Sequence, residues 1–130
     1  MNHLTRPAVL ALLLAGLVVA LYAPVRDFEF VAYDDDLCIT GVEGIRQGLS
    51  LPGIAWAFTS VQCANWYPLT RLSWMIDAQL FGMDPGAFHL TNAALHLAAS
   101  LVFFLAFLRL TGAPFRSFVV AAIFSLHPLH

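Results

Sequence analysis

Two long stretches without a charged residue constrain this chain more than any other feature. The first runs from Pro7 to Ala23, and the second runs from Phe88 to Leu108, just before Arg109. At 1.5 Å per residue, a helix of about 20 apolar residues crosses the roughly 30 Å hydrocarbon core of a bilayer. Both stretches are therefore predicted to be transmembrane helices.

The composition agrees with a membrane protein. Of the 130 residues, 60% are hydrophobic and 11% are charged, and the mean hydropathy is +0.78. A soluble domain is about half apolar and about a quarter charged. The chain has no lysine and no basic run, which gives nucleic-acid binding no support.

The first apolar stretch has two interpretations, an uncleaved anchor or a cleavable signal peptide. Cleavage after Leu21-Tyr22-Ala23 matches the small-residue rule poorly and would leave Pro24 just after the cut, whereas Val18 and Ala20 fit better. We favour the anchor, and the signal peptide stays the alternative.

Flanking arginines predict the topology, because short cytoplasmic segments are enriched in them. Arg6, Arg109 and Arg116 flank the apolar segments. The fold class predicted is an all-α membrane protein with two full transmembrane helices and one truncated helix. Its parts are a cytoplasmic end and first helix (1–24), an exoplasmic loop (25–87), a second helix (88–108), a cytoplasmic loop (109–117) and the start of a third helix (118–130). We expect the chain to be the front part of a longer protein.

Two short amphipathic or juxtamembrane helices are predicted in the loop, over residues 51–58 and 69–81. Ser50 suits the N-cap of the first, and Trp56 and Phe58 make it a candidate for the membrane interface. Gly82 is expected to end the second, and residues 84–86 to form a turn.

The second loop helix places Leu69, Leu72, Ile76 and Leu80 on one face. Asp77 borders that face and is expected to be a solvated residue at its edge.

The second apolar stretch carries His89, Asn92, His96 and Ser100 along one helix face. Such a stripe should face protein or water. It can hold helices together by hydrogen bonds or take a direct part in a site.

Three adjacent carboxylates, Asp34, Asp35 and Asp36, follow the first apolar stretch closely. They could supply a catalytic base or bind a metal beside a membrane-borne substrate, or form a solvated turn. Cys38 and Cys63 could form a disulfide if the loop is exoplasmic, or stay as two thiols.

Several short motifs occur in the order of a known membrane family. They span residues 30–36, 53–59, 65–70, 80–82, 88–92, 95–97 and 126–130. Their order resembles the N-terminal part of GT-C-fold glycosyltransferases with C-terminal tetratricopeptide repeats, which include the transmembrane-and-tetratricopeptide-repeat O-mannosyltransferases. The resemblance covers roughly residues 27–130.

The resemblance implies a membrane enzyme, here a bacterial one of the inner membrane. Its donor would be a polyprenyl-phosphate-linked, mannose-like sugar and its acceptor a protein hydroxyl on the exoplasmic face. The acidic motif falls on Asp34-Asp35 or on Asp35-Asp36. Asp35 is predicted to be the general base, with Asp34 as its partner or as a metal ligand. Because the remaining helices and repeats are absent, the fragment alone is expected to be inactive.

A departing lipid phosphate needs positive charge or hydrogen-bond donors. The candidates are Arg71, His89, His96, His127 and His130. A snorkelling interfacial arginine is the alternative for Arg71. A divalent metal ion is a candidate cofactor, with Asp34, Asp36 and His127 as its ligands.

Two rival functions come from other classes. The chain could be a non-catalytic membrane scaffold whose loop binds a partner, or it could line an ion pathway with His89, Asn92 and His96.

Overall fold

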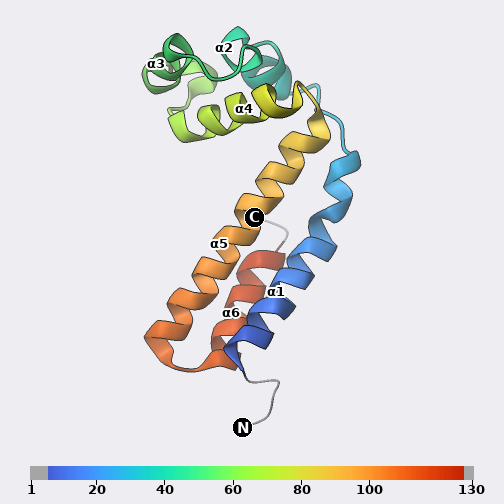
Figure 1. The fold of residues 1–130 in the computed structure, drawn as a ribbon, viewed down its shortest axis with the longest axis vertical. Coiled ribbons are helices and arrows are strands. Elements are labelled where there is room, and N and C mark those ends of the chain that lie inside the picture. The colour runs from blue at the N-terminus through green and yellow to red at the C-terminus, as the bar shows by residue number, and fades with distance from the viewer. Residues whose placement is uncertain (1–5, 128–130) are drawn as a thin grey trace. The chain divides into compact units, whose positions relative to one another are not determined.

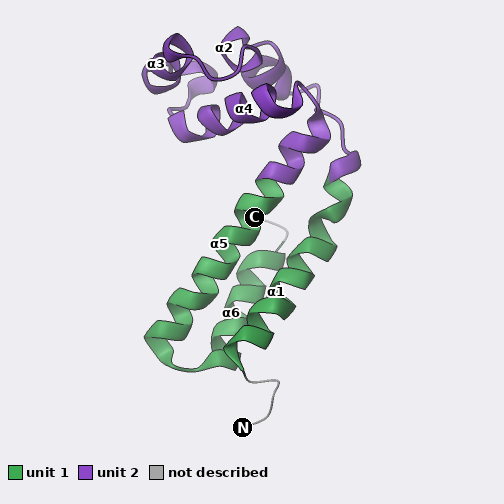
Figure 2. Ribbon diagram, in the orientation of Figure 1, with its two compact units in different colours: residues 1–25, 92–130 green, residues 26–91 purple. Residues whose placement is uncertain are grey.

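The computed structural model describes residues 6–127, and these residues form helices and connections without a strand (Figure 1). The elements are α1 (Pro7–Tyr22), η2 (Ala23–Asp27), η3 (Asp36–Thr40), α2 (Glu43–Arg46), α3 (Leu51–Thr59), η4 (Gln62–Ala64), α4 (Pro68–Phe81), α5 (Pro85–Thr111) and α6 (Pro114–Leu126). The chain divides into two compact units (Figure 2). Unit 1 combines residues 1–25 with 92–130, and unit 2 is residues 26–91.

Within residues 6–127, two helices are long and apolar enough to cross a membrane, as the sequence predicts. They cover Pro7–Asp27 and Pro85–Thr111, and α6 is a shorter apolar helix. The helix boundaries after the second span differ from the prediction. Instead of a connection over 109–117, only residues 112 and 113 separate α5 from α6. Arg109 suits the last turn of α5, and Pro114 suits the first position of α6.

Unit 1 packs one face of α1 against parts of α5 and α6. Leu10 and Leu14 lie one turn apart on α1 and form a buried cluster with Phe104 of α5 and Ala121 of α6. Small side chains at Ser100, Ser117 and Ser125 are also buried, and they suit close helix packing in membranes. The other faces of α1 leave large apolar residues exposed, which a water-facing helix avoids.

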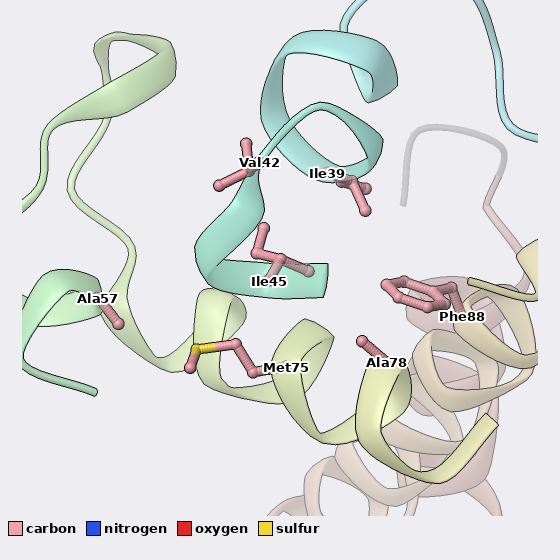
Figure 3. Packing of buried hydrophobic residues seen from close by; sticks show 7 residues of the cluster. All are labelled: Ile39, Val42, Ile45, Ala57, Met75, Ala78 and Phe88. Atoms are coloured by element: carbon pink, nitrogen blue, oxygen red, sulfur yellow. The ribbon is translucent and has the colours of Figure 1, made fainter. Parts of the chain in front are cut away.

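Unit 2 has an apolar core of its own (Figure 3). Its buried members are Ile39, Val42, Ile45, Ala57, Met75, Ala78 and Phe88. The helices α3 and α4 fall where the sequence predicts them. The Ser50 hydroxyl caps α3 by accepting the N–H of Gly53 at 3.1 Å. A Cβ atom on Gly53 would lie 2.6 Å from the Cε atom of Met75, so glycine permits the close packing of α3 on α4.

The segment between α4 and α5 corrects one prediction. Gly82 ends α4 with φ +66°, as expected for a glycine. Residues 84–86, however, start α5 instead of forming an isolated turn. The Asp84 carboxylate accepts the N–H of Gly86 at 3.1 Å, and Pro85 begins the helix. Aspartate and proline favour helix starts as well as turns, which explains the difference.

A disulfide joins Cys38 of η3 to Cys63 of η4. This bond settles the choice between a disulfide and two thiols. Cys63 and Ala64 have φ of 57° and 58°, a left-handed conformation that costs a non-glycine residue on the order of 1 kcal/mol or more. The Gln62 side chain adds a second link to η3, because its amide donates to the carbonyl of Leu37 at 3.0 Å.

Reduction of this disulfide should destabilise unit 2. The cysteines are 25 residues apart, and opening a loop of that length costs about 3 kcal/mol in the chain-entropy description. Denaturant unfolding in detergent micelles, with and without dithiothreitol, measures the effect through Trp56, Trp66 and Trp74, which all lie in unit 2. The Cys38→Ser/Cys63→Ser double variant is the control, since its stability should not respond to reductant. Equal stability of the oxidised and reduced parent would contradict the expectation.

Candidate functional site

The three adjacent carboxylates form a turn that leads into η3. The carbonyl of Asp34 accepts the N–H groups of Leu37 and Cys38, at 3.1 and 2.8 Å. Asp36 begins η3, and its Oδ1 atom accepts the Thr40 hydroxyl at 3.2 Å. The backbone of the motif is therefore fixed by its own short-range hydrogen bonds.

Asp35 differs from its two neighbours. Asp34 and Asp36 are exposed, whereas Asp35 is half-buried. The Oδ2 atom of Asp35 accepts the backbone N–H of Val31 at 2.8 Å. This bond orients the Asp35 carboxylate.

Arg71 of α4 is buried, with 1% of its surface exposed. Its guanidinium donates to four backbone carbonyls, those of Ala57, Ser60, Gln62 and Asn65. The snorkelling interpretation is therefore wrong, because a snorkelling arginine keeps its charge in water.

Two aromatic rings complete the surroundings of the Arg71 guanidinium. Its central carbon lies 5.0 Å from the ring centre of Trp56 and 4.6 Å from that of Tyr67. A phosphate would have to displace carbonyls to reach this charge. The geometry thus gives Arg71 a structural role, which is to hold the segment between α3 and α4.

Asp77 of α4 is also buried, with 3% of its surface exposed. The expectation of a solvated edge residue is wrong, because the side chain is buried and its Oδ1 atom accepts the Thr91 hydroxyl of α5 at 2.7 Å. Burial raises the pKa of Asp77 above its ordinary value of 3.8, and the bond from Thr91 opposes the rise in pKa.

His89 lies near the start of α5 in unit 2. Its Nε2 atom is buried and has no hydrogen-bond partner within residues 6–127. The rings of Phe28 and Phe30 lie beside it, each with its centre 6.4 Å from that of the imidazole. A buried ring nitrogen without a partner is unusual and needs an explanation, such as a bound water or ligand.

His96 belongs to unit 1 and holds helices together. Its Nε2 atom lies 3.0 Å from the carbonyl of Ser125, and because a carbonyl only accepts, Nε2 carries the proton. The Tyr22 hydroxyl reaches the same carbonyl at 3.5 Å. Ser125 lies in the last turn of α6, where carbonyls lack a helical partner, so the contact satisfies an orphan acceptor.

The remaining candidates are Ser100, Asn92, His127 and His130. The hydroxyl of Ser100 bonds the carbonyl of His96 on its own helix, and Asn92 is exposed. His127 directly follows α6, and His130 lies outside the described residues. In the part of the chain that the structure describes, no three histidine, cysteine, aspartate or glutamate side chains gather as metal ligands.

The sequence is similar to two curated proteins. It is 31% identical over 139 aligned residues to Protein O-mannosyl-transferase TMTC1 of Mus musculus, across 95% of this chain and 14% of that protein. It is 33% identical over 66 residues to Protein O-mannosyl-transferase Tmtc1 of Drosophila melanogaster, across 51% of this chain and 8% of that protein. The chain thus spans about a seventh of the length of the mouse relative. No family model and no solved structure matches the sequence.

Replacing Arg71 by lysine should strongly destabilise unit 2. An ammonium is a compact point charge with three donors, so it cannot reproduce the planar fork that reaches four carbonyls. We expect a loss of about 2 kcal/mol or more in the free energy of unfolding, because buried carbonyls are left without donors. Denaturant unfolding followed by tryptophan fluorescence measures it. Arg46→Lys is the matched control at an exposed site, and an equally small effect of both variants would contradict the assignment.

Replacing Asp77 by asparagine should change the pH dependence of stability. A carboxyl group whose pKa is raised by folding contributes stability below its unfolded pKa of about 3.8 and loses that contribution as the pH rises through the folded pKa. Asp77→Asn keeps an acceptor for Thr91 but removes this loss, so the variant should gain stability relative to the parent as the pH rises. Unfolding free energies between pH 4 and 8 test this.

The variant Thr91→Val refines the Asp77 test. It removes the hydrogen bond that favours the charged carboxylate, so the pKa of Asp77 should rise further and the loss of stability should shift to higher pH. Parallel stability curves for the parent and Asp77→Asn would show that the carboxyl group does not titrate differently on folding.

Proposed function

We propose that this chain is the N-terminal part of a membrane glycosyltransferase that transfers a mannose-like sugar from a polyprenyl-phosphate donor to a protein hydroxyl. The observation that carries the proposal is the similarity to two protein O-mannosyl-transferases, one of them matched along 95% of this chain. Two apolar helices of spanning length support a membrane protein. The chain covers a small part of each relative, so the activity is proposed for the complete protein.

Asp35 is the general base in this proposal. In an inverting transfer, its carboxylate takes the proton of the acceptor hydroxyl while the hydroxyl oxygen bonds the anomeric carbon of the sugar. The bond from that carbon to the lipid phosphate breaks, and the phosphate leaves with the electron pair. The hydrogen bond from Val31 supports Asp35 for this role, because a base must be held in one orientation toward the proton it removes. Asp34 is its partner.

The Cys38–Cys63 disulfide supports an exoplasmic position for unit 2, since disulfides persist in oxidising compartments. In a bacterial cell this is the outer face of the plasma membrane, where a polyprenyl-phosphate sugar and a protein acceptor would meet. The arginines beside the apolar segments agree with this orientation.

Among the candidate phosphate ligands, the structure supports His89 best. Its Nε2 atom is buried and has no protein partner within the described range, whereas the Nε2 atom of His96 already bonds Ser125. His89 is therefore our first choice for a donor to the departing phosphate. His127 and His130 are further candidates in the complete protein.

Asp35→Asn in the full-length protein should reduce sugar transfer by at least about 100-fold, the usual contribution of a general base. An amide accepts the Val31 hydrogen bond but cannot take the hydroxyl proton, so membrane insertion and abundance should stay unchanged. Transfer from a radiolabelled polyprenyl-phosphate sugar to an acceptor protein, assayed in membranes, measures the effect.

Glu43→Gln is the matched control for Asp35→Asn. Glu43 is an exposed carboxylate of the same unit, and its side chain bonds Gln47 of the following turn. This variant should keep full transfer. If Asp35→Asn transfers sugar as well as Glu43→Gln, the base assignment fails and the scaffold function becomes the better account.

A further inference from the structure

Both charged side chains of helix α4 are buried, and three of its large apolar side chains are exposed. Arg71 and Asp77, its two charged residues, are 1% and 3% exposed. Leu69, Ile76 and Leu80 are 74%, 41% and 65% exposed. The helix rests on the core of unit 2 with other apolar residues. Its outward face, however, carries large apolar side chains and no charge, whereas the outward face of a helix in water is polar or charged.

The exposed apolar residues follow one line along the helix. Ile76 comes seven residues after Leu69, and Leu80 comes four residues after Ile76, so the three share one face. We call them the apolar stripe. Arg71 is held by backbone carbonyls, and Asp77 is held by Thr91, so neither charge of α4 is directed to this face.

Chain connection limits what can cover the stripe. Residues 82–84 separate the end of α4 from the start of α5, which is long and apolar enough to span a membrane. Four residue steps extend to at most about 14 Å. The end of α4 is therefore tied to the point where a candidate transmembrane helix begins.

We propose that the apolar stripe of α4 contacts a lipid surface, with the helix lying in the interfacial layer of the membrane. An interfacial helix buries an apolar face at the boundary between headgroups and acyl chains. The absence of outward charge on α4 and its short connection to α5 both favour lipid over water. The inference requires α5 to enter the membrane, and it does not depend on sugar transfer.

Fluorescent labels on single cysteines test the proposal. The variants Leu69→Cys, Ile76→Cys and Leu80→Cys receive an environment-sensitive nitrobenzoxadiazole label in the complete 130-residue chain. The chain is reconstituted at high dilution in phosphatidylcholine vesicles, which separates its copies. The native cysteines stay oxidised in their disulfide and do not react. Phosphatidylcholine with brominated acyl chains quenches labels in lipid, and iodide quenches labels in water.

Thr70→Cys and Glu43→Cys are the matched controls. Thr70 is exposed on α4 about 100° around the helix from Leu69, and Glu43 is exposed on α2. We expect brominated lipid to quench the three stripe labels several-fold more than either control label, and iodide to show the opposite order.

Two results would overturn the proposal. Iodide quenching of the stripe labels equal to that of the controls would show that the stripe faces water. Protection from both quenchers would show that protein covers it. A label at Leu95→Cys on α5 reports insertion, and if iodide alone quenches it, α5 lies outside the lipid and the inference fails with it.

Discussion

The buried guanidinium of Arg71 is the contact on which the rest of unit 2 depends. The helix α3 ends at Thr59, and the chain then passes through η4 and reaches α4 with few regular backbone hydrogen bonds. Carbonyls in such a segment need donors when they are buried. Arg71 supplies donors to four of them. Two of these carbonyls belong to Gln62 and Asn65, which flank the left-handed residues Cys63 and Ala64. The disulfide joins the same segment to η3, which begins at Asp36 of the acidic motif. Arg71 and the acidic motif are therefore linked through this segment.

This chain of contacts gives the acidic motif its rigidity. Cys38 lies two residues after Asp36, and Gln62 bonds the carbonyl of Leu37 between them. The Asp35 carboxylate is thus held directly by the hydrogen bond from Val31. Its backbone is held indirectly, through η3, the disulfide and the segment that Arg71 of α4 binds. Precise placement of a base follows from packing beyond its immediate neighbours. For the proposed transfer reaction, these supporting residues would help to hold Asp35 in place.

The sequence predicts elements better than it predicts the environment of charged residues. Helix period and capping residues located α3 and α4, because those signals are local. The roles of Arg71 and Asp77 could not be found in the same way, since their partners are carbonyls 6 to 14 residues earlier and a hydroxyl 14 residues later. One signal was present: α4 carries no other charge that could pair with either residue. The start of α5 at Pro85 shows a different limit, because aspartate and proline serve turns and helix starts alike.

The division of unit 1 into two sequence segments has a consequence for biosynthesis. Leu14 of α1 packs with Ala121 of α6, yet all of unit 2 is translated between them. At about 5 to 20 residues per second, the ribosome needs on the order of 5 to 20 s to cover that interval. Cys38 and Cys63 both leave the ribosome before α6. The disulfide can therefore form before α1 packs against α6. The order of synthesis therefore lets the disulfide-linked part of the protein mature before the helix bundle closes.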